Sequence, residues 1–340
     1  MEQKKFEQLD SLRFFAILIV LLAHWGEKRF YILSHVFQGA RGVNLFFVIS
    51  GFLITLGLIR SKYNGCAIQT SLFKFYIRRS LRIFPIYYLT LLFLWLFDYS
   101  RIADSMAWNM FYASNFYNIK IHDWGNMGHL WSLAVEEQFY LVWPFIILIN
   151  PKKILPYLIV GAILISEMAK LYWFARGEEY WWYEYVHPIG ALDSLAIGGL
   201  LSYFYYFHQS RLKTALYNYY VITAVFVIAV IGQYLSSHYF FLTDRFFMSV
   251  FFAWLIGRSA FGFTGTAGYI LNSKILRYIG KISYGIYLIA PLAPGLFTYM
   301  KYPIDPNLRF LIYIAAIIGI ASISWYAFEK PILKLKEKFE

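Results

Sequence analysis

Long apolar runs separated by short polar or basic segments make up most of this 340-residue chain. A membrane-spanning helix needs about 20 predominantly apolar residues, and the pattern predicts about ten such helices, several of them short enough to require tilting or partial re-entry. The predicted spans are residues 10–26, 43–60, 83–98, 135–150, 154–172, 190–207, 217–235, 246–261, 281–299 and 309–328. Since no repeat or linker divides them, we expect one all-α domain over residues 1–340, a polytopic membrane helix bundle.

The composition supports a membrane protein. Hydrophobic residues make up 60% and charged residues 15%, whereas soluble domains are nearer half apolar and one quarter charged. The net charge of +12 would also suit a nucleic-acid-binding protein. However, the basic residues lie in short clusters between apolar runs, which favours membrane topology and no nucleic-acid partner. The single cysteine, Cys66, excludes an internal disulfide and a cysteine-based zinc site, and we expect no metal.

The distribution of lysine and arginine predicts the orientation. Ten spans place both termini on one side of the bilayer. If that side is the cytoplasm, it carries 20 lysines and arginines, and the outer side carries 10, among them Arg41, Lys170 and Arg245. This bias follows the positive-inside rule, so we predict cytoplasmic termini. The charged N-terminus has no cleavable signal pattern, and we expect the first span to be retained.

The first span, residues 9–25, carries ionisable side chains within an apolar run. Arg13 and His24 are eleven residues apart, which on a helix is within about 20° of the same face and about 16 Å along the axis. Asp10 is one turn before Arg13, so the two can pair. Ionisable residues inside a span are a functional hypothesis by default. The alternative is that Arg13 snorkels to the headgroups and His24 marks the far interface.

A second polar cluster lies at residues 128–140, at the entrance of the fourth span. Ser132, Glu136 and Tyr140 follow at intervals of four and share a helix face, with His129 one turn earlier. Glu137 is about 100° round from Glu136. Two interpretations stay open. The carboxylates belong to an active site, or they stand at a helix N-terminus, where the dipole favours glutamate and Ser132 would be the cap.

A third cluster, within residues 76–88, is basic. Arg79 and Arg82 are one turn apart, and Arg78 adds another guanidinium. Arginine forks suit phosphates, so these three are candidate ligands for a donor such as a coenzyme A thioester on the cytoplasmic side. The alternative is a positive-inside anchor.

Weaker candidates are isolated polar residues within spans. Asn44 and Ser50 lie in the second span, Asp193 lies in the sixth, and Gly51 can allow close helix approach. Each of these could also serve only in packing. The candidate substrate-binding set is Asp10, Asn44, Ser50, His129, Ser132, Tyr140 and Asp193. The sequence contains no P-loop, GxSxG elbow, HExxH motif or dinucleotide fingerprint.

Taken in order, these motifs resemble the integral-membrane type-3 acyltransferases, mostly bacterial enzymes that O-acylate polysaccharides and other envelope glycans. The resemblance covers nearly the whole chain. The matching segments are 9–13 with His24, 46–53, Arg79 and Arg82 before Phe84–Pro85, 129–133 with 135–140, Leu192–Asp193 with Gly198–Gly199, and 282–288. One departure is in the ninth span, where many members have a histidine soon after Tyr-Leu. Here the sequence after Leu288 reads Ile289–Ala290–Pro291.

The resemblance implies a multi-pass protein of the bacterial cytoplasmic membrane that takes an acyl group from cytosolic acyl-CoA, usually acetyl-CoA, to a sugar hydroxyl. It places the family's essential arginine and histidine at Arg13 and His24, and its CoA-associated arginines at Arg79 and Arg82. Some members carry a fused extracytoplasmic esterase-like domain, and we expect the membrane domain to stand alone here. Direct transfer, a partner acyl-transfer protein and a homo-oligomer all remain open.

We therefore predict an O-acetyltransferase for an envelope glycan such as O-antigen, capsule or exopolysaccharide. His24 would be the general base, since an unperturbed histidine titrates near pH 6.5, and Glu136 or Glu137 would orient its imidazole. Arg79 and Arg82 would hold the CoA phosphates. An acetyl-histidine relay is a variant of this scheme. The rival function is a transporter or flippase that uses the same charges as a proton relay. Release of free CoA thiol distinguishes the two.

Overall fold

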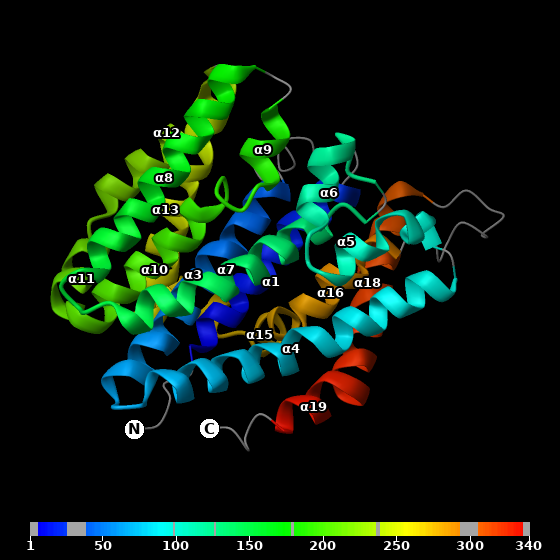
Figure 1. Ribbon diagram of the computed structural model, residues 1–340, viewed down its shortest axis with the longest axis horizontal. Coiled ribbons are helices and arrows are strands. Elements are labelled where there is room, and N and C mark those ends of the chain that lie inside the picture. Colours follow the sequence, from blue (N-terminus) through cyan, green and yellow to red (C-terminus); the bar gives the residue numbers. More distant parts are fainter. Residues whose placement is uncertain are drawn as a thin grey trace.

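A computed structural model describes residues 6–25, 39–97, 99–125, 127–177, 180–235, 239–292 and 305–335, and the regular elements in these ranges are all helical (Figure 1). The longer helices are α1 (Glu7–Trp25), α3 (Gly39–Tyr63), α4 (Ile68–Leu96), α7 (Leu130–Ile149), α8 (Leu155–Arg176), α10 (Leu192–Phe207), α12 (Tyr219–Leu235), α13 (Tyr239–Phe261) and α18 (Pro306–Ser324). The shorter ones are η2 (Tyr99–Ser105), α5 (Met106–Met110), α6 (Ser114–Ile121), α9 (Trp181–Val186), α11 (Gln209–Leu216), α14 (Gly265–Leu271), α15 (Lys274–Lys281), α16 (Ser283–Ile289), η4 (Ala290–Leu292), the π-helix η5 (Trp325–Glu329) and α19 (Lys330–Lys334).

The helices confirm a polytopic membrane protein. Six of the described helices are long and apolar enough to cross a bilayer, and the number is eight if two bent pairs, α11 with α12 and α13 with α14, each count as one span. A helix occupies at least part of each of the ten predicted ranges. The two predicted spans that are not among these eight correspond to α10 and α16, which are shorter helices. Residues 293–299 of the predicted ninth span lie outside the described residues. The side on which the termini lie stays a prediction.

Two predicted boundaries are wrong. Helix α4 begins at Ile68, not near residue 83, so most of the basic stretch expected as a loop is helical. Helix α7 begins at Leu130, five residues before the predicted span. Hydropathy alone ends a span at the first charged residues, but lysine, arginine, glutamine and glutamate are good helix formers. A bundle interior can also hold them where they face a cavity.

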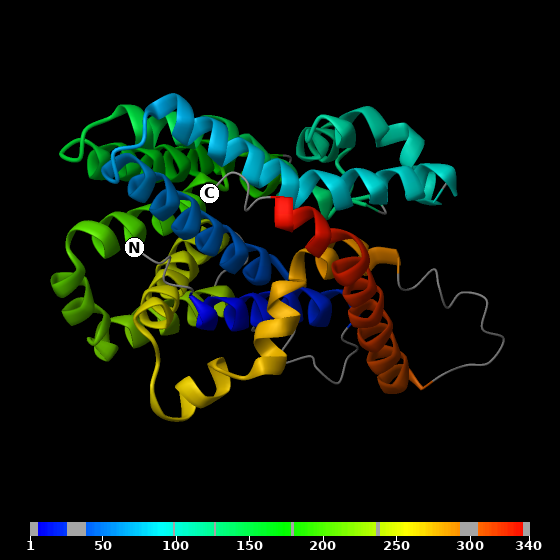
Figure 2. The same ribbon diagram turned by 90° about the horizontal axis from the view of Figure 1, so that it is seen from below.

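Helix α3 lies at the centre of the bundle and packs most closely against α10. The two backbones touch through glycines, because a Cβ on Gly51 would overlap the Leu195 carbonyl, and one on Gly198 would overlap the backbone of α3 at Val48. The Ser202 hydroxyl donates a hydrogen bond to the Phe52 carbonyl at 2.5 Å. Small residues are the usual means of close helix contact in membranes, and the predicted role of Gly51 is confirmed. Figure 2 shows α1, in dark blue, beside α3, with α15 crossing it.

Polar contacts fix α7 against α3. The Trp143 indole N–H donates to Thr55 Oγ1 at 2.7 Å. At the end of α3, Lys62 Nζ donates to the carbonyls of Ile147 and Asn150 at 3.1 and 2.5 Å. These carbonyls lie at the C-terminal end of α7, where the last carbonyl groups of a helix have no intrahelical N–H partner. The contacts therefore hold α3 and α7 at a fixed rotation about their axes.

The glycine contact gives a test of the packing. We expect Gly51→Ala to lower stability, since a methyl group forced into a close-packed interior typically costs about 1–3 kcal/mol. Gly57→Ala in the same helix is the matched control, because no atom lies within 4 Å of a Cβ at that position. Thermal unfolding of the detergent-purified proteins should separate the two. Equal melting temperatures for the two variants would contradict the packing described here.

Candidate active site

An ion pair on α1 opens onto the interior of the bundle. Arg13 Nη1 lies 2.6 Å from Asp10 Oδ1, as the one-turn spacing predicted. Helix α15 crosses α1 at this point, and a Cβ on Gly280 would overlap the Asp10 carbonyl. The close crossing fixes the turn of α1 that carries the pair. Both side chains remain partly accessible, 15% for Arg13 and 22% for Asp10. Arg13 lines the central cavity described below, and Asp10 does not.

Glu136 on α7 is held by two hydroxyl groups. Ser50 of α3 donates to Glu136 Oε1 at 2.9 Å, and Tyr140, one turn further along α7, donates to Oε2 at 2.8 Å. The interpretation as an N-terminal cap is wrong, because α7 begins at Leu130 with His129 as its N-cap residue and Glu136 lies well past the first turn. The hydrogen bonds of Glu136 run to Ser50 and Tyr140 and not to His24. These two hydrogen bonds fix the position of the Glu136 side chain.

The neighbouring Glu137 is held differently. Its Oε1 is buried and has no hydrogen-bond partner among the described residues. A buried carboxylate oxygen without a donor is costly unless the site gives it a proton or a ligand. Glu137 is therefore the less constrained of the two carboxylates in this region.

The arginines of α4 face inward. The Arg79 guanidinium lies over the Tyr140 ring, 5.3 Å from its centroid, and 5.9 Å from that of Phe75. Because α4 is helical from Ile68 onward, Arg79 and Arg82 are one turn apart on one face, as predicted. They lie beside the carboxylates of α7 instead of in a surface loop. Arg78, on another face of α4, does not line the cavity described next.

These side chains enclose a central cavity with about 810 Å³ of space, part of it open to solvent. Its walls come from α1, α3, α4, α7 and α16. The predicted residues that line it are Arg13, Ser50, Arg79, Arg82, Ser132, Glu136, Glu137 and Tyr140. Residues predicted from four separate segments of the sequence are thus brought together.

A histidine cluster lies where α7 begins. The Ser132 and Tyr287 hydroxyls are 2.7 Å apart, and Tyr287 donates to the His129 carbonyl at 2.9 Å. The His129 ring packs edge-on against Tyr287, and its Nε2 is buried without a hydrogen-bond partner in the described part of the chain. His24, in the last turn of α1, is near enough to His129 for their charges to interact. Neither histidine lines the central cavity.

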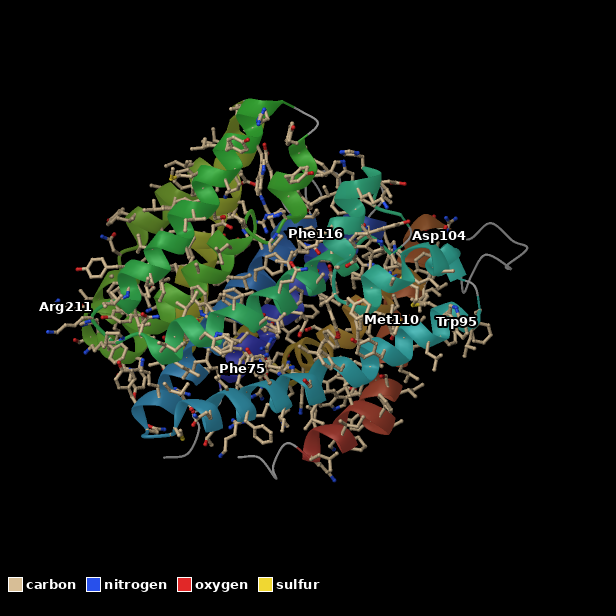
Figure 3. The ribbon with its side chains drawn as sticks, in the orientation of Figure 1. Phe75, Trp95, Asp104, Met110, Phe116 and Arg211 are labelled. Atoms are coloured by element: carbon tan, nitrogen blue, oxygen red, sulfur yellow. The ribbon has the colours of Figure 1, made fainter. Side chains whose placement is uncertain are left out.

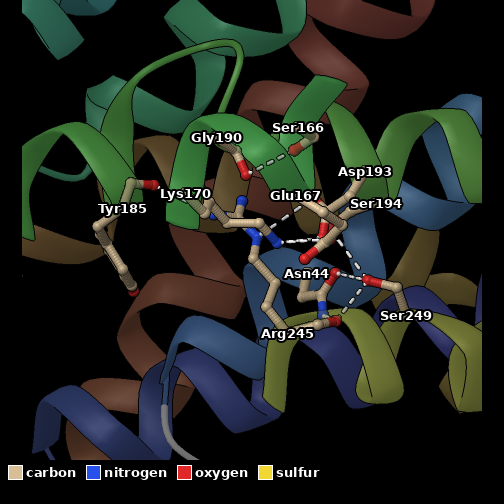
Figure 4. Close-up of polar contacts among 10 residues, drawn as sticks. All are labelled: Asn44, Ser166, Glu167, Lys170, Tyr185, Gly190, Asp193, Ser194, Arg245 and Ser249. Carbon is tan, nitrogen blue, oxygen red and sulfur yellow. Dashed lines mark hydrogen bonds and ion pairs between the residues drawn. The ribbon is translucent and has the colours of Figure 1, made fainter. Parts of the chain in front are cut away.

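Asn44 and Asp193 lie elsewhere, in a charged network among α3, α8, α10 and α13 (Figure 4). Lys170 Nζ is 3.0 Å from Asp193 Oδ2 and 2.7 Å from Glu167 Oε1. Asn44 donates to the Arg245 carbonyl at 3.1 Å and accepts from Ser249 at 2.9 Å. These two predicted residues are separated from the central cavity and belong to a second site.

Several site residues could not be singled out from the sequence pattern. Ser283, Tyr284 and Tyr287 of α16 line the central cavity, and their segment stood out only as a family motif. Lys170 was counted as a flanking charge, although its side chain is only 3% exposed. A lysine one turn after Glu167 near a span's end was the available signal, because such charges tend to be paired and functional.

The central cavity brings guanidinium groups and carboxylates together. Arg13, Arg79 and Arg82 supply guanidinium groups suited to phosphate oxygens. Glu136 and Glu137 supply carboxylates. Among the described residues, no three histidine, cysteine or carboxylate side chains are grouped so that they could hold a metal ion.

Comparison with known proteins identifies the family. The sequence pattern described as an acyltransferase domain matches residues 6–329. The chain belongs to the acyltransferase 3 family. It is 28% identical over 364 residues to the peptidoglycan O-acetyltransferase OatA of Listeria monocytogenes, covering 98% of this chain and 56% of the relative. It is 28% identical over 356 residues to the O-acetyltransferase OatA of Staphylococcus aureus, covering 96% of this chain and 57% of the relative.

This acyltransferase thus spans a little over half the length of these curated relatives. No solved structure matches it. The family match confirms an enzyme, a multi-pass membrane acyltransferase with bacterial relatives. It gives no support to the transporter hypothesis.

The two carboxylates of this acyltransferase should respond differently to amidation. In Glu136→Gln, one hydroxyl of Ser50 or Tyr140 faces an NH₂ donor, and a lost hydrogen bond to a charged group costs about 1.5–3 kcal/mol. We expect lower thermal stability as well as lower turnover. In Glu137→Gln, Oε1 has no hydrogen bond to lose, so we expect unchanged stability. If this carboxylate exchanges a proton during transfer, turnover should fall by roughly 10²-fold, the size of a typical acid–base contribution.

The measurement is turnover per folded molecule beside a melting curve for each variant. If both variants lose only protein level and keep full specific activity, the carboxylates are structural. If Glu137→Gln melts well below the parent, its carboxylate has a structural partner that the geometry does not suggest.

Proposed function

We propose that this chain transfers an acetyl group from acetyl-CoA to a sugar hydroxyl of a bacterial envelope glycan. The printed name of the Listeria relative makes peptidoglycan the first acceptor to test, ahead of O-antigen, capsule or exopolysaccharide. The observation that carries the proposal is the central cavity, in which Arg79 and Arg82 lie beside Glu136 and Glu137.

The arginines of this cavity are assigned to the donor. Acetyl-CoA carries phosphates, and charge-assisted hydrogen bonds from guanidinium groups are about twice as strong as neutral ones. The Tyr140 ring, held by Glu136, supports the Arg79 guanidinium. Glu136 therefore acts as a positioning residue, through Tyr140, rather than by orienting His24. Asp10 has the same kind of role toward Arg13. Arg78 is left outside the donor site, since it does not line the cavity.

His24 is assigned as the general base. It removes the proton from the acceptor hydroxyl, whose oxygen forms a bond to the thioester carbonyl carbon. The carbon–sulfur bond breaks, and the imidazolium returns the proton to the CoA thiolate. The products are the sugar acetate and free CoA. In the relay version, the imidazole nitrogen itself takes the acetyl group first and then passes it to the hydroxyl. His129, whose charge interacts with that of His24, is assigned to the same end of the site.

The orientation belongs to this proposal. With both termini in the cytoplasm, α1 begins on the cytoplasmic side, so Arg13 is nearer the cytosolic donor and His24 nearer the outer face. The acetyl group then leaves toward the side where envelope glycans lie. Delivery is direct or through a partner protein.

The experiment is a transfer assay with purified protein, acetyl-CoA and a panel of envelope glycans. Mass spectrometry should show the glycan gaining the mass of one acetyl group, with one free CoA thiol released per acetyl transferred. Thiol release without acetylated product in any glycan, or no thiol release at all, would overturn the proposal.

A further inference from the structure

A second cavity lies beside the central one, with about 550 Å³ of space, part of it open to solvent. We call it the charged cavity, after the residues that line it: Arg41, Lys170, Glu184, Asp244 and Arg245. Helices α3 and α13 begin around it, α8 ends at it, and α9 contributes one wall.

The cations of this cavity are paired with carboxylates. Arg41 Nη2 lies 2.9 Å from Asp244 Oδ1, and Lys170 lies within 3.0 Å of both Glu167 and Asp193. Both cations are nearly fully buried, with 3% of each side chain exposed. Buried cations that are already neutralised by carboxylates have little net attraction for an anion. Donor and acceptor side chains that line one cavity suit a ligand that both donates and accepts hydrogen bonds.

The Arg245 guanidinium has an N–H group without a hydrogen-bond partner among the described residues. One of its N–H groups donates to the Tyr185 carbonyl at 3.2 Å, and Nε lies 3.9 Å from Asp193 Oδ1, which is too long for a hydrogen bond. Nε is buried and without a hydrogen-bond partner in the described ranges. Figure 4 shows the Arg245 side chain reaching past Lys170 toward the Tyr185 carbonyl. A guanidinium has five N–H donors, so Arg245 can bind a ligand in this cavity.

Aromatic rings form the other wall. Trp131 and Tyr185 line the charged cavity with ring centroids 5.2 Å apart. Trp181 stacks on Tyr185 at 5.3 Å, and Trp124 contacts both Trp131 and Tyr185. Aromatic faces beside hydrogen-bonding groups suit a sugar, which has an apolar ring face and hydroxyls at its edge. Paired cations and an aromatic wall together indicate an uncharged carbohydrate.

The charged cavity adjoins the central cavity. Val43 lines both, and Trp131 of one is followed in sequence by Ser132 of the other. The Arg245 guanidinium lies 5.7 Å from the centroid of Phe47, which lines the central cavity. A ligand in the charged cavity is therefore separated from the central cavity by little more than Val43 and Phe47.

We propose that the charged cavity is the acceptor subsite and takes an uncharged hexose or N-acetylhexosamine ring, presenting a hydroxyl toward the central cavity. This inference rests on the proposed function. It assigns Arg245 and Trp131 to acceptor binding, and it gives Asn44 and Asp193 the role of holding Arg245 and Lys170 in place.

The test uses an uncharged N-acetylglucosamine trimer as probe, with hydrogen–deuterium exchange as the readout. We expect the trimer to slow amide exchange in α9 and at the start of α13, whereas acetyl-CoA slows exchange in α4. In Arg245→Gln, the trimer concentration needed for half of the protection should rise about tenfold or more, since a hydrogen bond from a charged group is lost. Protection by acetyl-CoA should be unchanged.

Control variants and a charged sugar separate binding at this subsite from a general effect of charge. Arg211→Gln is the matched control, because Arg211 lies on α11 and points away from the bundle (Figure 3). A galacturonate trimer, with a carboxylate on each ring, should protect less than the uncharged trimer. If Arg245→Gln does not fold, Glu184→Gln, nearly identical in shape, should weaken trimer protection instead.

The outcomes distinguish this proposal from the function itself. Absence of trimer protection in α9 and α13, or stronger protection by galacturonate, overturns the acceptor subsite. Protection as expected, with no acetyl transfer to any glycan, supports a carbohydrate site and overturns the proposed acetyltransferase function alone.

Discussion

Replacing His24 with glutamine is expected to leave a protein that inserts and binds acetyl-CoA but transfers acetyl groups roughly 10²–10⁴-fold more slowly. Glutamine keeps hydrogen-bonding capacity and approximate size, but an amide takes up no proton near neutral pH. A structural histidine would tolerate the change. The measurement is acetyl transfer to glycan, normalised to folded protein and to acetyl-CoA binding.

His208→Gln is the control for this experiment, since His208 lies between α10 and α11, away from the lining of both cavities. The relay version adds one expectation. Radiolabelled acetyl should be trapped on the parent chain when the acceptor is withheld, and not on His24→Gln. Transfer at the parental rate by His24→Gln would exclude both versions of the mechanism.

The second large effect is expected from the arginines of the donor site. Each charge-assisted hydrogen bond to phosphate contributes about 1.5–3 kcal/mol, so each alanine replacement of Arg79 or Arg82 should weaken acetyl-CoA binding about tenfold or more. Lysine at either position should restore only part of the affinity, because the bidentate fork is lost. Titration of the detergent-purified protein with acetyl-CoA measures this directly.

Lys74→Ala is the matched control, a cation on the same helix that does not line the central cavity. Arg78→Ala should have a smaller effect than Arg79→Ala for the same reason. Unchanged affinity in the Arg79→Ala, Arg82→Ala double variant would rule out the phosphate role, and an equal loss in Arg78→Ala would indicate a general effect of positive charge on α4.

Relations within one helix could be predicted from the sequence, because helix geometry fixes them. Asp10 pairs with Arg13 one turn away, and Tyr140 donates to Glu136 one turn before it. The same helical spacing predicted that Arg79 and Arg82 lie on one face of a helix, and both line the central cavity. These predictions needed only the helical repeat and the chemistry of the side chains.

Relations between helices could not be predicted in this way. Nothing local brings Ser50 of α3 to Glu136 of α7, 86 residues along the chain. Arg41 and Lys170 were taken as flanking charges because each lies near the end of a span. Their carboxylate partners, Asp244 and Asp193, lie on other helices. A count of basic residues cannot tell a snorkelling cation from one neutralised inside the bundle.

The contact of α3 with α10 through Gly51 and Gly198 also bears on how the molecule can move during turnover. Helix α3 carries Ser50 in one cavity and Asn44 in the other, and α10 carries Asp193. Alternating-access transporters rock one group of helices against another. Backbones in direct contact cannot slide without breaking their packing. The two compartments should therefore keep a constant separation, with the travelling acyl group, and not the scaffold, crossing the short distance between them.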